Sequence, residues 1–137
     1  MSEVKIVHRQ PTVEEYSRLR DVVGWGNPDE QATRESIKNA LFSVCVEKDD
    51  RIIGLGRVVG DGGLYFYVQD IIVLPEHRGK GYAGIIMDEV MKYINSKVGK
   101  GGYIGLFAAK GVEGLYKKYG FVERPNEQFG SGMFILK

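Results

Sequence analysis

Several features are scarce in this sequence of 137 residues, and each scarcity narrows the possible functions. Cys45 is the single cysteine, so no disulfide can form within one chain and a cysteine-type metal site is excluded. Lysine and arginine (19) almost balance aspartate and glutamate (18), giving a net charge of +1. This balance argues against a broad nucleic-acid-binding surface. No apolar run approaches the roughly 18 residues that a membrane span needs.

Targeting and metal signals are also lacking. The N-terminus reads Met-Ser-Glu-Val-Lys, without the apolar core of a signal peptide, so we expect a cytoplasmic protein with no membrane partner. The two histidines, His8 and His77, show no ligand spacing, so no metal is expected. The length and the ordinary share of apolar residues are most simply explained by one domain over residues 1–137.

Periodicity and turn residues predict the order of helices and strands. Thr12 and Glu15 form a capping box that predicts the first helix, and Asn27 followed by Pro28 is the expected start of the second. The resulting order, β-α-α-β-β-β-α-β-α-β-β, predicts an α/β fold with a mixed sheet. The expected strands are 4–8, 42–47, 52–59, 64–74, 103–108, 121–122 and 129–136, and the expected helices are 12–23, 28–39, 80–97 and 112–119.

The most informative segment is residues 70–84, Asp-Ile-Ile-Val-Leu-Pro-Glu-His-Arg-Gly-Lys-Gly-Tyr-Ala-Gly. An apolar strand runs into a loop with Arg78 and Lys80 beside two glycines, and a helix follows at once. A helix N-terminus presents unpaired N–H groups and the positive end of its dipole. The segment therefore predicts a pyrophosphate-binding site.

Two other interpretations of this glycine pattern are possible. Gly79-x-Gly81-x-x-Gly84 also fits the dinucleotide-binding fingerprint of a Rossmann fold. That fingerprint needs a strand directly before the first glycine and an acidic residue ending the next strand. Here residues 75–78 intervene, and the strand at 103–108 ends without an acid. The glycines could also form a turn of structural importance alone.

The loop sequence Arg78-Gly79-Lys80-Gly81-Tyr82-Ala83 resembles the cofactor signature of the GNAT superfamily of acyl-CoA-dependent N-acetyltransferases. A second match, Leu-Tyr-Lys-Lys-Tyr-Gly-Phe at 115–121, resembles the family's downstream segment. The resemblance covers essentially the whole chain, most securely residues 64–122. It implies a GNAT-type fold and transfer of an acetyl group from acetyl-CoA, the co-substrate, to a primary amine. The amine would attack directly in a ternary complex.

The resemblance also implies a set of cofactor-binding and catalytic residues. Tyr116 would donate a proton to the departing thiolate, because a phenol (pKa about 10) stays protonated at neutral pH. Asp70 lies inside an apolar run on the strand that would flank the thioester, so it is the candidate proton acceptor, with a purely structural role as the alternative. Ala109 stands where many members have asparagine. The implied cofactor contacts are Ile71, Ile72, Val73, Arg78, Gly79, Lys80, Gly81, Tyr82, Ala83, Gly84, Ala109 and Tyr116.

Three aromatic residues are candidates for the acceptor site. Trp25 lies in a Gly-Trp-Gly break between the two first helices, in a region that covers the acceptor in this family. Tyr65 and Tyr67 lie on the central strand, and all three could instead pack in the core. They suggest a small amine with an apolar portion, and a peptide lysine or N-terminus, an aminosugar and a polyamine are the alternatives. A GNAT-like domain that binds acyl-CoA without turnover is the alternative function. The last strands could pair two subunits into a homodimer.

Overall fold

The chain is divided into two parts in the computed structural model, which describes residues 3–137. The first part ends at Leu106, and the second runs from Phe107 to Lys137. The single domain predicted over residues 1–137 stays a prediction. Among the residues described, no helix combines the length and the apolar character needed to cross a bilayer.

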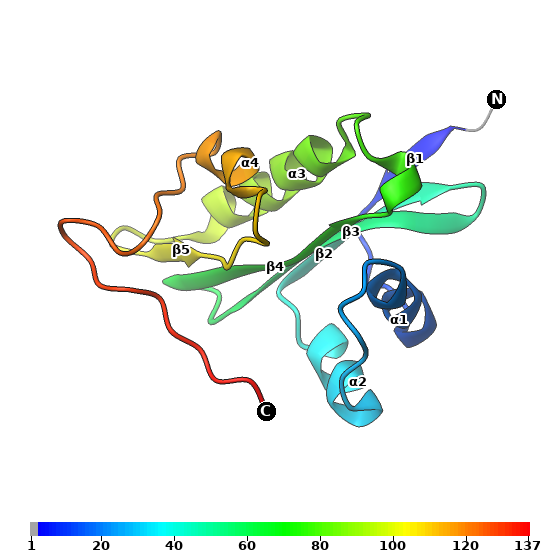
Figure 1. Ribbon diagram of the computed structural model, residues 1–137, viewed down its shortest axis with the longest axis horizontal. Coiled ribbons are helices and arrows are strands. Elements are labelled where there is room, and N and C mark those ends of the chain that lie inside the picture. Colours follow the sequence, from blue (N-terminus) through cyan, green and yellow to red (C-terminus); the bar gives the residue numbers. More distant parts are fainter. Residues whose placement is uncertain (1–2) are drawn as a thin grey trace. The chain divides into compact units, whose positions relative to one another are not determined.

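A five-stranded sheet with the order β1-β2-β3-β4-β5 organises the first part. Neighbouring strands are antiparallel except β4 and β5, which are parallel. Helices α1 and α2 cover one face of the sheet and α3 covers the other (Figure 1). The elements are β1 (Val4–Val7), α1 (Val13–Val22), α2 (Glu30–Lys38), β2 (Phe42–Lys48), β3 (Arg51–Gly60), β4 (Tyr65–Val73), the 3₁₀ turn η1 (Pro75–His77), α3 (Tyr82–Lys97) and β5 (Tyr103–Gly105).

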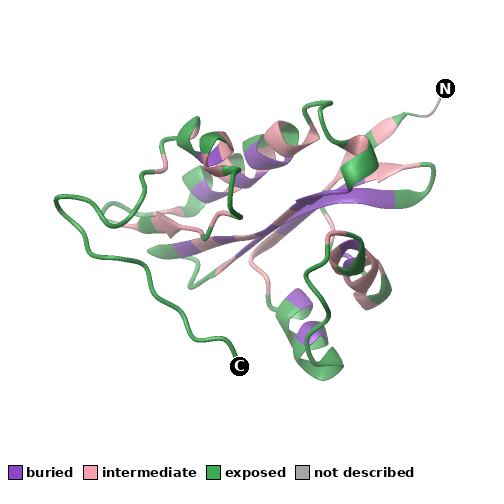
Figure 2. Cartoon of the chain, viewed as in Figure 1, coloured by how far each residue is buried: buried purple, intermediate pink, exposed green. Residues whose placement is uncertain are grey.

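Helix α3 packs closely against the middle of the sheet, as its apolar periodicity predicts. Its inward side chains, Ile86, Met87, Val90 and Ile94, have no exposed surface, and the buried residues of α3 and the central strands lie along facing surfaces (Figure 2). Gly56 of β3 permits this approach, because an added Cβ would lie 2.5 Å from the Cγ2 atom of Ile86.

The starts of α1 and α2 test two sequence predictions. The capping box of α1 is confirmed, since Thr12 Oγ1 accepts from the N–H of Glu15 and Glu15 Oε1 accepts from the N–H of Thr12. The predicted start of α2 is wrong. The helix begins at Glu30, and Asp29 caps it by accepting from the N–H of Ala32 at 2.8 Å. Asn27 instead donates to Asp21 Oδ1 of α1, so its amide is not the cap.

The second part contains one helix, α4 (Glu113–Lys117), and none of its described residues forms a strand. The strands predicted at 121–122 and 129–136 are therefore corrected. Alternating apolar residues become a strand only where a neighbouring edge supplies hydrogen-bond partners. Here the backbone of Asn126 bonds to Phe129 O, and its side chain accepts from the N–H groups of Gln128 and Phe129. This local turn replaces a ladder.

The predicted strand at 103–108 is also shorter than expected. Strand β5 ends at Gly105, because its parallel pairing with β4 stops at the pair Tyr67 and Gly105. Three residues further along, β4 contains an irregularity in its pairing with β3, described below.

Candidate functional site

A bulge interrupts β4 at the residue predicted to be the proton acceptor. Arg57 of β3 pairs with Gln69, whereas Leu55 pairs with Ile72, so Gly56 alone faces two residues of β4. Such a bulge bends a strand and redirects its side chains. Asp70 takes the left-handed conformation, with φ of 58°. For a residue other than glycine this conformation persists only where the surroundings enforce it.

The surroundings of Asp70 consist of hydrogen-bond donors. The hydroxyl of Tyr16, on α1, donates to Oδ2 at 2.6 Å, and Arg57 Nε donates to the same oxygen at 3.0 Å. Gln69 Nε2 donates to Oδ1 at 3.0 Å, and a guanidinium nitrogen of Arg20 lies 3.7 Å from that oxygen. The Asp70 side chain has no exposed surface. Burial, followed by the nearby carboxylate charge, raises the pKa of Tyr16, so this phenol remains a donor.

The predicted acceptor-site residues lie on or beside the face of the sheet that carries α1. Strand alternation places Tyr65 and Tyr67 on the same face as Gln69, whose amide reaches Asp70. Tyr65 is exposed and Tyr67 is half-buried. Trp25 lies in the loop after α1, and 42% of its surface is exposed. An exposed aromatic side chain in a loop is available for binding.

On its β5 side, the pairing of β4 ends before the bulge is reached. The parallel pairing covers three residues of each strand, from Tyr65 with Tyr103 to Tyr67 with Gly105. Ile72 and Val73 are buried and Ile71 is half-buried. The backbone of residues 71–73 thus forms the end of a strand whose neighbour has already stopped.

The predicted pyrophosphate loop follows directly. Arg78 Nε donates to Val73 O at 3.0 Å, which ties the loop to the end of β4. Gly79 and Gly81 have φ of 78° and 84°, and an added Cβ at either position would meet nothing within 4 Å. These glycines are required by the backbone conformation and not by crowding. Residues 78–81 are exposed, and α3 begins at Tyr82. The loop therefore presents the amides, glycines and cations that suit an anionic ligand.

In the second part, Tyr116 lies on α4 with its ring edge-on to Phe121, at 6.2 Å between ring centres. Burial raises the pKa of Tyr116, so its phenol is protonated at neutral pH. Ala109 is exposed in the segment before α4, where its carbonyl accepts from the N–H of Val112. The roles of Tyr116 as proton donor and of Ala109 as a cofactor contact stay predictions.

Comparison with known families decides the classification of the chain. A family model described as an acetyltransferase (GNAT) domain matches residues 21–136. The chain belongs to the GNAT acetyltransferase family. The family resemblance and the mixed α/β fold predicted from the sequence are thereby confirmed.

Individual relatives are consistent with this membership. Protein SA2161 of meticillin-resistant Staphylococcus aureus is 38% identical, with a TM-score of 0.89 over 98% of this chain and 100% of that one. The uncharacterized N-acetyltransferase ycf52 of Porphyra purpurea is 26% identical over 82% of this chain. The chain spans 66% of the length of that relative. A structure of aminoglycoside N-acetyltransferase AAC(6')-Iy, in complex with CoA, shares the GNAT fold, with a TM-score of 0.68 at 19% identity over 100% of this chain and 96% of that one.

Sequence reasoning missed the partners of Asp70 in this GNAT chain. Arg57 gave a usable signal, because a lone arginine inside the apolar run Ile52–Val59 needs a buried acceptor. Tyr16 and Arg20 gave none, because they are spaced as ordinary helix residues. Arg20 also bonds to the loop that carries Trp25, at 2.8 Å to Gly26 O. The candidate site thus extends further along α1 than the motifs indicated.

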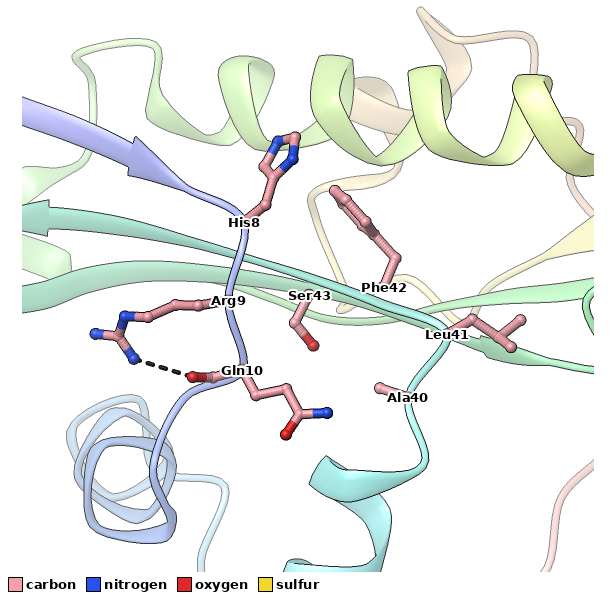
Figure 3. A pocket seen from close by; sticks show the side chains of 7 residues that line it. All are labelled: His8, Arg9, Gln10, Ala40, Leu41, Phe42 and Ser43. Atoms are coloured by element: carbon pink, nitrogen blue, oxygen red, sulfur yellow. Dashed lines mark hydrogen bonds between the residues drawn. The ribbon is translucent and has the colours of Figure 1, made fainter.

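A separate pocket of about 240 Å³ lies away from these motifs, at the end of β1 (Figure 3). Ser43 points toward Gln10 and away from Phe42, and its buried hydroxyl has no hydrogen-bond partner in the described part of the chain. The guanidinium of Arg9 is already held by Glu15, among other acceptors. A small pocket of this polarity is suited to water. Its lining is His8, Arg9, Gln10, Ala40, Leu41, Phe42 and Ser43.

Proposed function

We propose that this GNAT-family protein transfers an acetyl group from acetyl-CoA to the primary amine of a small acceptor. The observation that carries the proposal is the exposed loop 78–81, with two left-handed glycines and two cations, at the start of α3. Coenzyme A presents a diphosphate, which suits N–H groups at a helix start and the positive end of the helix dipole. Family membership supports the same ligand.

In this proposal the loop and the end of β4 bind different portions of the cofactor. Residues 79–84 bind the diphosphate through backbone N–H groups, and Arg78 and Lys80 add positive charge. The backbone of residues 71–73, beyond the last pairing with β5, binds the amide groups of the pantetheine arm. The N–H of Ile72 or Val73 polarises the thioester carbonyl. An oxyanion donor of this kind is worth about 3 kcal/mol of transition-state stabilisation. Ala109 completes the predicted set of cofactor contacts.

The reaction is a direct attack in a ternary complex. The neutral amine nitrogen forms a bond to the carbonyl carbon, and the bond from that carbon to sulfur breaks. Tyr116, which its raised pKa keeps protonated, gives its proton to the departing thiolate. The nitrogen releases one proton as the amide forms, and that proton returns through water to the Tyr116 oxygen. The amine must first lose a proton, since a lysine-like amine has a pKa of about 10.4.

The prediction that Asp70 takes this proton stays a prediction. Both of its oxygens already accept hydrogen bonds from Tyr16, Arg57 and Gln69. Of the roughly four acceptor positions of a carboxylate, only one on Oδ1 is then left for a proton, and Arg20 lies 3.7 Å from that oxygen, which belongs to a side chain with no exposed surface. The geometry therefore gives more support to Asp70 as the group that fixes the bulge, with the amine proton passing to water. The pH dependence of the rate separates the two roles, as developed in the Discussion.

The acceptor in this proposal is a small amine with an apolar portion. Trp25, Tyr65 and Tyr67 supply the aromatic surface for that portion, because they lie on or beside one face of the first part. The cytoplasmic location expected from the sequence stays a prediction.

The test is an assay with the purified protein, acetyl-CoA and a panel of amines, in which release of free CoA thiol is measured. We expect amine-dependent thiol release and stabilisation of the protein by CoA. CoA binding without thiol release for any amine would favour the acyl-CoA sensor instead. Thermal stabilisation by NAD and not by CoA would contradict the proposal and support the dinucleotide-binding alternative.

The homodimer predicted from the sequence is also part of the proposal. The tail residues Met133, Phe134, Ile135 and Leu136 are between 77% and 88% exposed and are consecutive apolar side chains. Exposed apolar runs of this kind mark interaction surfaces. Sedimentation at several protein concentrations tests the homodimer. A protein that is still monomeric at about 100 µM, well above a Kd of about 10⁻⁵ M for a weak dimer, would contradict it.

A further inference from the structure

Arg20 connects the loop that carries Trp25 to the buried carboxylate of β4. Its Nε donates to Gly26 O at 2.8 Å, and one terminal nitrogen donates to Trp25 O at 3.3 Å. The other terminal nitrogen lies 3.5 Å from the Tyr16 hydroxyl and 3.7 Å from Asp70 Oδ1. One guanidinium thus contacts two carbonyls of the loop and two groups of the interior.

The guanidinium also lies over aromatic rings. Its central carbon is 5.7 Å from the ring centre of Trp25 and 5.6 Å from that of Tyr16. Both distances fall within the range of cation–π attraction. The Arg20 side chain is only 16% exposed, so these interactions are partly shielded from water. The indole of Trp25 therefore packs against the Arg20 guanidinium, which is itself paired with Asp70.

Two glycines give the loop conformational freedom. Gly24 and Gly26 flank Trp25 with φ of 80° and 70°, and an added Cβ at either residue would meet nothing within 4 Å. Glycines lose more conformational freedom on ordering than other residues. Besides the contacts of the Arg20 side chain, the N–H of Trp25 donates to the Arg20 carbonyl at 2.9 Å. The loop is also bonded to Asp21, through the N–H of Gly24 at 3.1 Å and the amide of Asn27 at 2.6 Å. Both the side chain and the backbone of Arg20 thus hold the tryptophan.

We propose that Arg20 is a positioning residue that holds the Trp25 ring in place as a wall of the acceptor site, with Asp70 as its anchor. The inference rests on the proposed function, because it assumes that an amine binds beside Trp25. Arg20 itself does not touch the reacting atoms. All four polar groups that its guanidinium contacts belong to the protein, so Arg20 supports the indole and does not bind a charged group of the substrate.

The proposal predicts an effect confined to one substrate. Loss of the Arg20 contacts frees the indole and weakens amine binding, whereas the cofactor contacts on loop 78–84 and residues 71–73 are unaffected. We expect Arg20→Gln to raise KM for the amine about tenfold, the typical effect of losing one charged hydrogen bond. KM for acetyl-CoA should stay within about twofold.

The single tryptophan supplies a second readout that needs no substrate. In Arg20→Gln the emission of Trp25 should shift to longer wavelength, and acrylamide should quench it more strongly, because the indole, already 42% exposed, loses the guanidinium that lies over its ring. Arg34→Gln is the matched control, since Arg34 pairs with Glu30 on the exposed side of α2. The control should change neither fluorescence nor either KM.

A double variant tests whether the two residues act together. If Arg20 acts through Trp25, Arg20→Gln combined with Trp25→Phe should raise KM for the amine no more than the worse single variant does. Additive effects would contradict the proposal. Circular dichroism checks the fold of each variant. Should Arg20→Gln fail to fold, Arg20→Lys is measured instead: it keeps a charge near Asp70 but cannot donate to both loop carbonyls, and an unchanged KM for the amine would overturn the proposal.

The outcomes separate this inference from the proposed function. An equal rise in both KM values, or unaltered Trp25 fluorescence in Arg20→Gln, refutes the positioning role while amine acetylation stands. Absence of turnover with any amine refutes the proposed function. In that case the fluorescence measurement still tests whether Arg20 holds Trp25 in place. The role of Trp25 as a wall of the acceptor site is refuted together with the activity.

Discussion

Replacing Asp70 with asparagine separates the structural contribution of the buried carboxylate from any part it takes in proton transfer. Asparagine keeps the shape and one oxygen that can accept a hydrogen bond from Tyr16 or Arg57. It removes the negative charge. Arg57, whose side chain is only 3% exposed, then carries a positive charge without its carboxylate partner. Removing one member of a buried ion pair typically costs about 3–5 kcal/mol of stability.

The lower end of that range applies here, because the amide oxygen remains as an acceptor. We expect a loss of about 3 kcal/mol in the free energy of unfolding. For a chain of this size that corresponds to a fall in Tm of roughly 10 °C. Urea denaturation measures it. The control is Asp50→Asn: Asp50 is exposed, in a left-handed turn that asparagine tolerates, so its change should stay within about 0.5 kcal/mol.

Two results would refute this reasoning. A loss of stability below about 1 kcal/mol would mean that the buried charge of Arg57 does not need the Asp70 carboxylate as its partner. Failure of Arg57→Met to recover stability in the Asp70→Asn background would mean that the loss has another origin. The rate at varied pH then addresses catalysis. A lower kcat with an unshifted acid limb supports a positioning role, whereas a displaced or lost limb identifies Asp70 as the proton acceptor.

Three further predictions concern other parts of the chain. Tyr116→Phe should lower kcat about 100-fold and leave the Kd for CoA within about twofold, measured by steady-state kinetics and calorimetry; an unchanged kcat would remove its role as acid. The Arg9 guanidinium lowers the pKa of Glu15 from 4.5 to about 2, so this carboxylate stabilises the fold at neutral pH and loses that effect as the pH falls through this interval. In urea titrations, Glu15→Gln should therefore be less stable than the wild type by about 1–2 kcal/mol at pH 7, with the gap closing near pH 2, and a gap independent of pH would contradict this. Gly56→Ala should destabilise by about 2 kcal/mol, since the added methyl group meets Ile86, whereas Gly114→Ala in α4 meets nothing and should be neutral or stabilising; equal effects would refute the packing argument.

Local sequence signals predicted most of the first part, because helices and turns depend on nearby residues. The inward face of α3 followed from apolar spacing, and the capping box of α1 followed from Thr12 and Glu15. The glycines of the loop before α3 indicated a turn, and in it Gly79 and Gly81 have left-handed backbone. Each of these features is determined by residues within about one helical turn.

Features that depend on distant residues could not be predicted in this way. Asp70 binds Tyr16, 54 positions earlier in the chain, and no local pattern shows such a pair. The bulge in β4 depends on its register with β3, which alternation does not reveal. The strand predicted at 129–136 has the right alternation but no ladder partner in residues 3–137 of the structure. Sequence reasoning therefore found the motifs but not the network that joins Arg20, Asp70 and Trp25.

The measurement that tests the central claim most directly is a calorimetric titration of CoA into the purified, folded protein at low and moderate salt. Saturable binding of one CoA per chain is predicted, with weaker binding in the Arg78→Ala/Lys80→Ala variant and a larger difference between the two proteins at low salt, where charges are less screened. A folded wild-type protein that releases no heat and shows no thermal stabilisation with millimolar CoA would contradict the claim that the loop before α3 binds the cofactor.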